Sequence, residues 1–365
     1  MTQGPDRKIV LADGEEYTGH SFGAEGEKIL EIVFNTSMTG YQEILSDPSY
    51  TDQAVVMTYP LIGNYGMADD DFESGRLAPG ALIVREHNEE PSGFRADRTL
   101  GDVMKEFGTL GISGVDTRKL TRHIRDRGSM LCIVTGTETD KMTALRRIEE
   151  YEVPEDAVSR VSCREPYEVG NSIGNLHAVV IDCGIKRNIL RCLAERGIRI
   201  TVVPYNTPDV YIRRLRPNGI LVSNGPGDPN DVNETIRTVG NLIGEYPVFG
   251  ICLGHQIISI ASGASTYKLK FGHRGGNHPV KDLTTGRTEI TSQNHSYAVD
   301  EKSLAGTPLT VSHLNLLDGT VEGVTGAGGI LMGVQFHPES SPGPRDSMHL
   351  FDRFVRMMEE NRIHA

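Results

Sequence analysis

The chain has 365 residues, 38% of them hydrophobic, which is enough for two ordinary domains with separate apolar cores. Its formal net charge of −12 is spread along the sequence without a basic run, so we expect no nucleic-acid partner. No stretch of about 18 apolar residues is present and residues 1–8 are polar, which predicts a cytoplasmic protein without membrane contact.

Cysteine usage excludes two further classes of protein. The chain has 5 cysteines, an odd number, and none of them forms a Cys-x-x-Cys pair. This pattern argues against a disulfide framework and against a thiolate zinc site. Any cysteine with a special role must therefore owe it to its local surroundings.

The first part of the chain has a mixed, strand-rich pattern. Residues 9–11, 29–34, 54–58 and 81–84 are expected as strands, and residues 116–127 as a helix. We interpret residues 1–152 as a β-rich α/β N-terminal domain. Residues 153–176 lose this periodicity and collect Pro, Gly, Ser and Asn, which predicts a surface linker.

The second domain, residues 177–365, has a regular alternation of strands and helices. Such alternation predicts parallel strands joined by crossover helices, hence a doubly wound, mostly parallel sheet. Its ligand crevice is expected beyond the carboxyl ends of the strands. The expected strands are 177–182, 199–203, 219–223 and 247–251, and the expected helices are 188–195, 209–215, 233–243 and 256–262.

A cysteine between two glycines follows the strand at 247–251. In "GICLG", Gly250-x-Cys252-x-Gly254 has the spacing of a nucleophile elbow, a tight strand-to-helix turn that exposes the central side chain. The helix N-terminus there favours a thiolate and can stabilise an oxyanion. The alternative is a small buried cysteine in an ordinary turn, and the pentapeptide alone does not separate the two.

A candidate base lies near the end of the chain. "GILMGVQFHPES" predicts a buried strand at 330–336 that leads into His337 and Glu339. Residues i and i+2 of an extended segment share a face, so the carboxylate can orient the imidazole. Cys252, His337 and Glu339 would then be nucleophile, general base and orienting group.

These motifs resemble one family. "SNGPGDP", "GICLGHQ" and "GVQFHPES", in that order, are similar to the class I (triad) glutamine amidotransferases over roughly residues 177–360. The resemblance implies that Cys252 attacks the glutamine amide and that His337 passes a proton to the leaving ammonia. It also implies oxyanion and substrate loops, which map onto Gly225, Gly227, Leu253 and Gln256.

The N-terminal half extends the resemblance to nearly the whole chain. "FNTSMTGYQEILSDPSY", "YPLIGNYG" and "GVDTRKLTRHIRDRG" look like the first domain of the small-subunit family of carbamoyl phosphate synthetase. "FGHRGGNHPV" and "TSQNHSYAVD" continue the match. By resemblance, Ser49 would reach the bound glutamine in a crevice between the domains.

The same resemblance places Asn294, Ser296 and Tyr297 around the amino-acid end of the substrate. The family has glycine where Ser296 stands. If that backbone needed a positive φ, serine would cost about 1 kcal/mol. The departure therefore concerns the fine geometry of the site rather than its activity.

Other polar residues have ordinary interpretations. His255 is expected to pack or cap its helix, and His273 and His278 lack further ligands at metal-binding spacing, so no metal is predicted. Asp228 and Asp231 are interpreted as turn residues. The chain has no phosphate-binding motif of the Gly-x-x-x-x-Gly-Lys-Ser/Thr type and no cofactor is expected in it.

The resemblance implies that the ATP-dependent chemistry takes place in a partner protein. It implies a large subunit that binds Mg-ATP, activates bicarbonate and receives ammonia from this chain, as a heterodimer or a higher oligomer, for arginine and pyrimidine synthesis. Two alternatives stay open: a free-standing thiol amidohydrolase, and a non-catalytic regulatory partner on the same fold.

Overall fold

The computed structural model of the chain describes residues 4–170 and 175–364. The chain divides into two compact units, Met1–Pro154 and Glu155–Ala365, each with its own apolar core. Their boundary falls inside the segment 153–176 that the sequence indicates as a connection. Within the described ranges, every helix is too short or too polar to cross a membrane.

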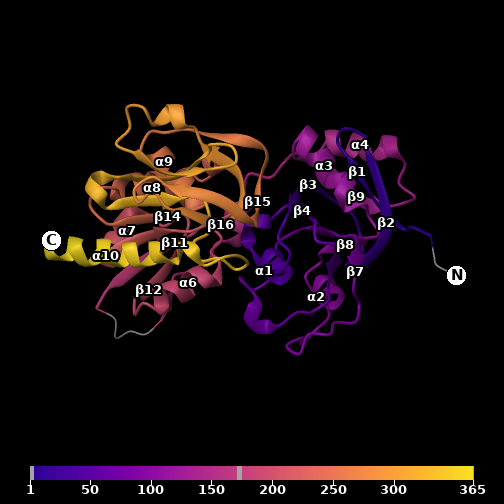
Figure 1. Ribbon diagram of the computed structural model, residues 1–365, viewed down its shortest axis with the longest axis horizontal. Helices are drawn as coiled ribbons and strands as arrows, with labels where there is room; N and C mark the ends of the chain where they lie inside the picture. The colour runs from indigo at the N-terminus through magenta and orange to yellow at the C-terminus, as the bar shows by residue number, and fades with distance from the viewer. Residues whose placement is uncertain (1–3, 171–174, 365) are drawn as a thin grey trace. The chain divides into compact units, whose positions relative to one another are not determined.

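Seven strands of the first unit close into a barrel (Figure 1). They are β1 (Arg7–Leu11), β2 (Glu16–Gly23), β3 (Lys28–Asn35), β4 (Gln53–Met57), β6 (Ala81–Ile83), β8 (Leu110–Ser113) and β9 (Met130–Gly136). Their order is β1–β2–β8–β6–β4–β3–β9, and β3, β4, β6 and β8 run parallel. A small separate sheet pairs β5 (Leu61–Ile62) with β7 (Glu86–His87).

The expected β-rich α/β character of this unit is confirmed. Strand β2 was not predicted, because its sequence EYTGHSFG consists mostly of polar and small residues and therefore shows no apolar alternation. The helix expected at 116–127 is present as α3 (Thr117–Arg127), where the Asp116 side chain accepts from the Lys119 N–H at 2.9 Å. The remaining helices are α1 (Tyr41–Ser46), η1 (Pro48–Tyr50), η2 (Asp69–Asp71), α2 (Leu100–Glu106) and α4 (Lys141–Glu149).

The second unit is built on one 10-stranded sheet, of order β10–β12–β11–β13–β14–β19–β18–β16–β15–β17. Five neighbours in its middle are parallel: β12 (Arg199–Pro204), β11 (His177–Asp182), β13 (Gly219–Val222), β14 (Val248–Ile251) and β19 (Leu331–Val334). The others are antiparallel: β10 (Tyr167–Val169), β15 (Thr266–Asp282), β16 (Thr288–Val299), β17 (Thr310–Asn315) and β18 (Val321–Gly326).

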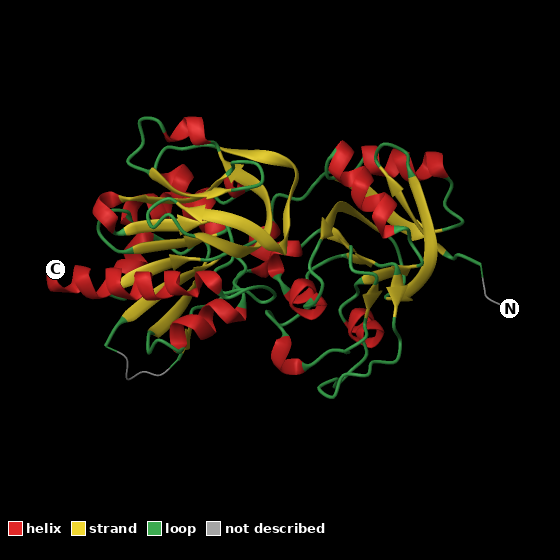
Figure 2. Cartoon of the chain, in the orientation of Figure 1, coloured by secondary structure: helices red, strands yellow, loops and turns green. Residues whose placement is uncertain are grey.

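Helices cover both faces of the parallel strands, so the expected doubly wound fold is confirmed (Figure 2). Along β11, Val180 joins one apolar core while Val179 and Ile181 join the other, since successive side chains of a strand face opposite ways. One core contains residues of α6 (Arg187–Ala194) and α10 (His349–His364). The opposite core contains residues of α7 (Asp209–Arg214), α8 (Asn233–Leu242) and α9 (Leu253–Ala261).

The segment expected as an irregular linker carries more structure than its composition indicates. It contains helix α5 (Ala157–Val161), whose Val158 is buried in the core of the second unit, and strand β10, which pairs with β12. Its residues 171–174 lie outside the described residues. Polar and small residues dominate this segment, so a short edge strand within it leaves no hydrophobic pattern to detect.

The antiparallel strands β15–β18 were not predicted as strands either. Two long strands, β15 and β16, run antiparallel with irregularities in register between Lys268 and His273 and between Gly275 and His278. These irregularities and the frequent Gly and His residues break the period-2 pattern on which strand prediction depends. The remaining short helices of the unit are η3 (Pro229–Asp231), η4 (Glu301–Leu304), η5 (Ala327–Gly329) and η6 (Asp346–Met348).

Candidate active site

Cys252 occupies a strained turn between β14 and α9. Its φ of 54° and ψ of −105° are rare for a residue with a side chain, and it is the N-cap of α9. The flanking glycines are sterically required: a Cβ on Gly250 would lie 2.5 Å from the Gly254 oxygen, and one on Gly254 would lie 2.0 Å from the Val222 oxygen. The geometry is that of the nucleophile elbow expected from the sequence.

Strand pairing brings the end of β19 beside this turn. β14 and β19 are parallel neighbours with Ile251 opposite Val334, and the Cys252 N–H donates to the Val334 oxygen at 2.8 Å. The Cys252 Sγ lies 3.5 Å from the Asn294 carbonyl oxygen and accepts from Gln335 Nε2 at 3.7 Å. The nucleophile candidate is thus held between β14, β16 and the segment after β19.

His337 and Glu339 follow β19 and contact each other as expected. His337 Nδ1 lies 2.6 Å from Glu339 Oε1, and both side chains are buried. His337 Nε2 has no hydrogen-bond partner among the described residues, although the Cys252 sulfur is near enough to raise the pKa of His337. The ring therefore binds Glu339 through Nδ1 and presents Nε2 on the side of the Cys252 sulfur.

A buried lysine completes this set, and sequence reasoning missed it. Lys186 Nζ lies 2.8 Å from Glu339 Oε1 and donates to the Ser340 carbonyl oxygen at 2.6 Å, with only 3% of its side chain exposed. It follows β11, and the Asp182 side chain holds the intervening loop by accepting from the Gly184 N–H at 2.9 Å. Only one feature of the sequence could have indicated Lys186 as a site residue. It follows the first strand of the parallel sheet, and ligands bind at the carboxyl ends of such strands.

Burial and neighbouring charges act in opposite directions on the pKa values of His337 and Glu339. Burial is the largest single influence and lowers the pKa of His337, but the Glu339 carboxylate and the Cys252 sulfur together outweigh it, so the net shift is upward. Burial raises the pKa of Glu339, whereas Lys186 and His337 together hold it below its ordinary value. These influences favour the imidazolium form of His337 and the ionised form of Glu339.

The predicted oxyanion and substrate loops lie around the elbow. A Cβ on Gly225 would lie 2.1 Å from the Cys183 oxygen and 2.8 Å from Leu253 Cδ2, so this turn packs directly on the residue after the nucleophile. Gly227 has φ +88°, a conformation that favours glycine. Gln256 is buried on α9, where its Nε2 donates to the oxygens of Tyr297 (2.9 Å) and Gln335 (3.0 Å).

The three residues predicted from "QNHSY" lie on β16. Asn294 contacts the Cys252 sulfur through its carbonyl, and Tyr297 is linked to Gln256, so both are in the neighbourhood of the nucleophile. Ser296 does not have a positive φ, and the backbone cost considered for serine at this position does not arise. Its Oγ accepts instead from Arg274 Nη2 at 2.5 Å.

Ser49 belongs to the first unit. It lies in η1 and is buried, and its N–H donates to the Asp47 side chain at 2.9 Å. Its role toward glutamine stays a prediction.

Other sequence candidates have the ordinary roles expected of them. His255 is fully buried in α9, where burial lowers its pKa to about 3 and keeps the ring neutral. Asp228 accepts from the Asn230 N–H at 2.9 Å in a turn. Burial raises the pKa of the remaining cysteines, which therefore stay thiols: Cys132, Cys163, Cys183 and Cys192.

Comparison with known families agrees with this geometry. Residues 179–357 match the family described as glutamine amidotransferase class-I. The second unit, with a cysteine at a nucleophile elbow beside a buried His-Glu pair, is a class-I glutamine amidotransferase domain. Residues 9–134 match the CPSase domain of the carbamoyl-phosphate synthase small chain.

Full-length relatives carry both parts. The carbamoyl phosphate synthase small chain of Oceanobacillus iheyensis is 47% identical over 98% of this chain and 97% of its own. A pyrimidine-specific small chain of Halalkalibacterium halodurans is 48% identical over 98% of this chain and 99% of its own. The small chain of Bacillus caldolyticus is 49% identical over 97% of each.

The chain belongs to the family of carbamoyl phosphate synthase small chains. It is the glutamine-hydrolysing subunit of such an enzyme, whose substrate is glutamine and whose partner is a large subunit.

The elbow glycines provide a first test. Gly254→Ala places a methyl group against the Val222 carbonyl, so we expect it to lower the free energy of unfolding by about 1–3 kcal/mol and to reduce glutaminase activity. Gly240→Ala is the control, because its Cβ would meet nothing closer than 3.8 Å in the last turn of α8; it should stabilise by roughly 0.4–1 kcal/mol. Chemical denaturation measures both, and equal stability of the two variants would contradict the packing described here.

The electrostatics provide a second test. Glu339→Gln removes the carboxylate that favours the imidazolium, so the pKa of His337 should fall, whereas Lys186→Met should move it in the opposite direction. Histidine-selective NMR titration measures both shifts. Glu289→Gln, beside the exposed His349, is the control and should leave the His337 pKa unchanged. A His337 pKa that does not respond to Glu339→Gln would refute the coupling.

Proposed function

We propose that Cys252 is the nucleophile of glutamine hydrolysis. In the first step the proton of the Cys252 thiol resides on His337 Nε2, the thiolate sulfur forms a bond to the side-chain amide carbon of glutamine, and the carbonyl π bond opens to an oxyanion. Helix α9 begins at Leu253, so the N–H groups of its first turn would face this charge, and the turn at Gly225 packs against Leu253. The first turn of the helix and the glycine turn would share the oxyanion.

The second step releases ammonia. The imidazolium of His337 gives the proton on Nε2 to the amide nitrogen, the C–N bond breaks, and a thioester on Cys252 remains. Glu339 holds the ring by its Nδ1 and Lys186 holds Glu339, so the proton donor is fixed in place. His337, now neutral, takes a proton from water, which attacks the thioester and releases glutamate.

Glutamine is held by groups around the elbow in this proposal. Gln256, Asn294, Ser296 and Tyr297 would position the amino-acid end of the substrate, and Ser49 would contribute from the first unit. The contacts that support this assignment are those of Asn294 with Cys252 and of Gln256 with Tyr297.

The ammonia would be used by a large subunit. We infer a cytoplasmic complex, a heterodimer or an oligomer of heterodimers, in which the large subunit binds Mg-ATP and bicarbonate and forms carbamoyl phosphate for arginine and pyrimidine synthesis. Direct transfer matters because free ammonia is protonated in water near pH 7 and ammonium is no nucleophile. One observation carries the proposal. The strained Cys252 lies beside His337, and His337 Nδ1 is already bound to Glu339.

Coupling between the subunits is the third testable expectation. The purified chain should release glutamate from glutamine slowly, and a co-expressed large subunit with bicarbonate and Mg-ATP should stimulate release strongly. Cys252→Ser should lower both rates by roughly 10³-fold or more, since the nucleophile is lost. Cys163→Ser, at a half-buried thiol outside the elbow, is the control and should keep both rates.

The alternatives give different results in the same assay. Rapid glutamate release at the same rate with and without the large subunit would indicate an independent amidohydrolase. No hydrolysis in either state, with Cys252→Ser indistinguishable from the parent, would indicate a regulatory partner without catalysis.

A further inference from the structure

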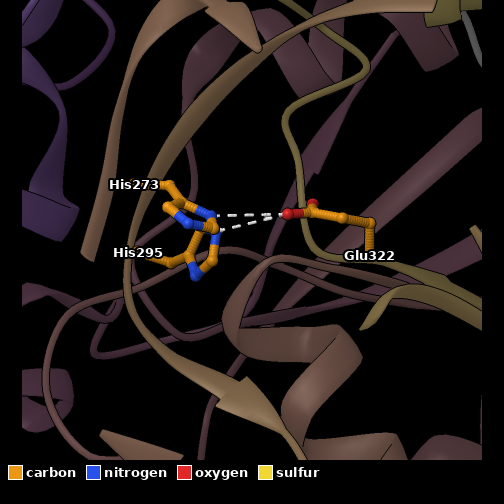
Figure 3. Close-up of side chains that lie close together, drawn as sticks. All are labelled: His273, His295 and Glu322. Carbon is orange, nitrogen blue, oxygen red and sulfur yellow. Dashed lines mark ion pairs between the residues drawn. The ribbon is translucent and has the colours of Figure 1, made fainter. Parts of the chain in front are cut away.

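Three buried side chains converge at a second place in the antiparallel part of the sheet (Figure 3). His273 on β15 pairs directly with His295 on β16, and Glu322 lies on β18. His273 Nδ1 is 3.5 Å and His295 Nε2 is 3.9 Å from Glu322 Oε1. One ligand-type atom from each residue lies within 4.8 Å of the other two.

The outer nitrogen of each imidazole is already bound to an oxygen. His273 Nε2 lies 2.8 Å from Asp318 Oδ2, and His295 Nδ1 lies 2.7 Å from the Tyr297 carbonyl oxygen. A carbonyl only accepts, so His295 Nδ1 carries the hydrogen and Nε2 presents a lone pair. Metal-binding histidines are commonly oriented in this way, by a carboxylate or carbonyl on the nitrogen that does not bind the metal.

Of the inner atoms, His273 Nδ1 lies 3.5 Å from Asn315 Nδ2 and the Glu322 oxygens accept hydrogen bonds, whereas His295 Nε2 lacks a hydrogen-bond partner among the described residues. Asn315 Nδ2 donates to Glu322 Oε1 at 3.0 Å and Gln293 Nε2 donates to Glu322 Oε2 at 2.9 Å, which fixes the carboxylate. His295 is 4% exposed, and its Nε2 has no hydrogen-bond partner among the described residues. A buried acceptor without a donor is unfavourable and marks a position where a ligand would be stabilising.

We propose that His273, His295 and Glu322 form a binding site for one Zn²⁺ ion. Two imidazole nitrogens and one carboxylate oxygen are a recurrent zinc ligand set, which leaves a fourth position for solvent. Bond lengths near 2.0–2.1 Å in a tetrahedron separate ligand atoms by about 3.4 Å. The observed 3.5 Å between His273 and Glu322 already fits, and His295 needs to approach Glu322 by about 0.5 Å from 3.9 Å.

Burial lowers the pKa of His273, but its hydrogen bonds to Asp318 and Glu322 raise it to about 9. The other titratable rings against His273 are His278 and His295, which both stay neutral because burial lowers their pKa.

The zinc site does not depend on the proposed function, but it lies next to the segment of β16 that contacts Cys252. His295 follows Asn294, whose carbonyl contacts Cys252, and its own Nδ1 binds the Tyr297 carbonyl. An ion bound by His273, His295 and Glu322 would link β15, β16 and β18. It would therefore stabilise residues 294–297 of β16. The sequence missed the site because its ligands lie on separate strands and each has an ordinary interpretation alone.

Zinc titration of the metal-free chain tests the proposal. We expect one equivalent of Zn²⁺ to bind, measured by isothermal titration calorimetry. Co²⁺ should give the visible absorption of a tetrahedral site, and zinc should raise the melting temperature. Glu322→Gln, which preserves side-chain size, should weaken zinc binding by about 100-fold or more.

Controls distinguish this site from other histidines and thiols. His349→Asn removes an exposed histidine that also faces a glutamate, Glu289, and should keep the wild-type affinity, as should Cys252→Ser. His273→Gln is the second site variant if Glu322→Gln fails to fold, as judged by circular dichroism. No stoichiometric zinc in the wild type, unchanged affinity in both site variants, or loss of zinc in Cys252→Ser would each overturn the assignment.

Discussion

Three buried charged groups in a row, Lys186, Glu339 and His337, form the interaction on which the proposed active site depends. Each ion loses its water in this position, and removing one partner of such a pair leaves an uncompensated charge that costs about 3–5 kcal/mol. Lys186 and Glu339 are 3% and 0% exposed, so solvent cannot replace either partner. This arrangement favours an ionised carboxylate and a protonated, oriented imidazole, and in the proposed mechanism His337 Nε2 carries out the proton transfer.

The doubly wound sheet makes this chain of charges possible. β11, β14 and β19 are parallel neighbours or near neighbours, so the residues that follow them meet at one edge. Lys186, Cys252 and His337 each come from the segment after one of these strands. The strain at Cys252 is tolerated because the glycines and β14 pairing fix the turn from both sides. Fold and chemistry are thus two consequences of the same strand order.

Local patterns in the sequence were sufficient for part of this account. The Gly-x-Cys-x-Gly spacing predicts the elbow, and the His-x-Glu spacing predicts that His337 and Glu339 share a face, because both constraints act over a few residues. Lys186 lies 153 residues from Glu339, and no local pattern connects them. Barrel closure in the first unit and the meeting of His273, His295 and Glu322 likewise depend on pairings between distant strands. Those features required the structure.

The measurement that tests the account most directly is a search for the covalent intermediate. Glutamine turnover would be stopped with acid within milliseconds to seconds, and the peptide that contains Cys252 would be examined by mass spectrometry. We predict a glutamyl thioester on Cys252, absent from Cys252→Ser and from the peptide that contains Cys163. Steady turnover with no acyl adduct on Cys252 over this time range, or with an adduct on another residue, would contradict the mechanism.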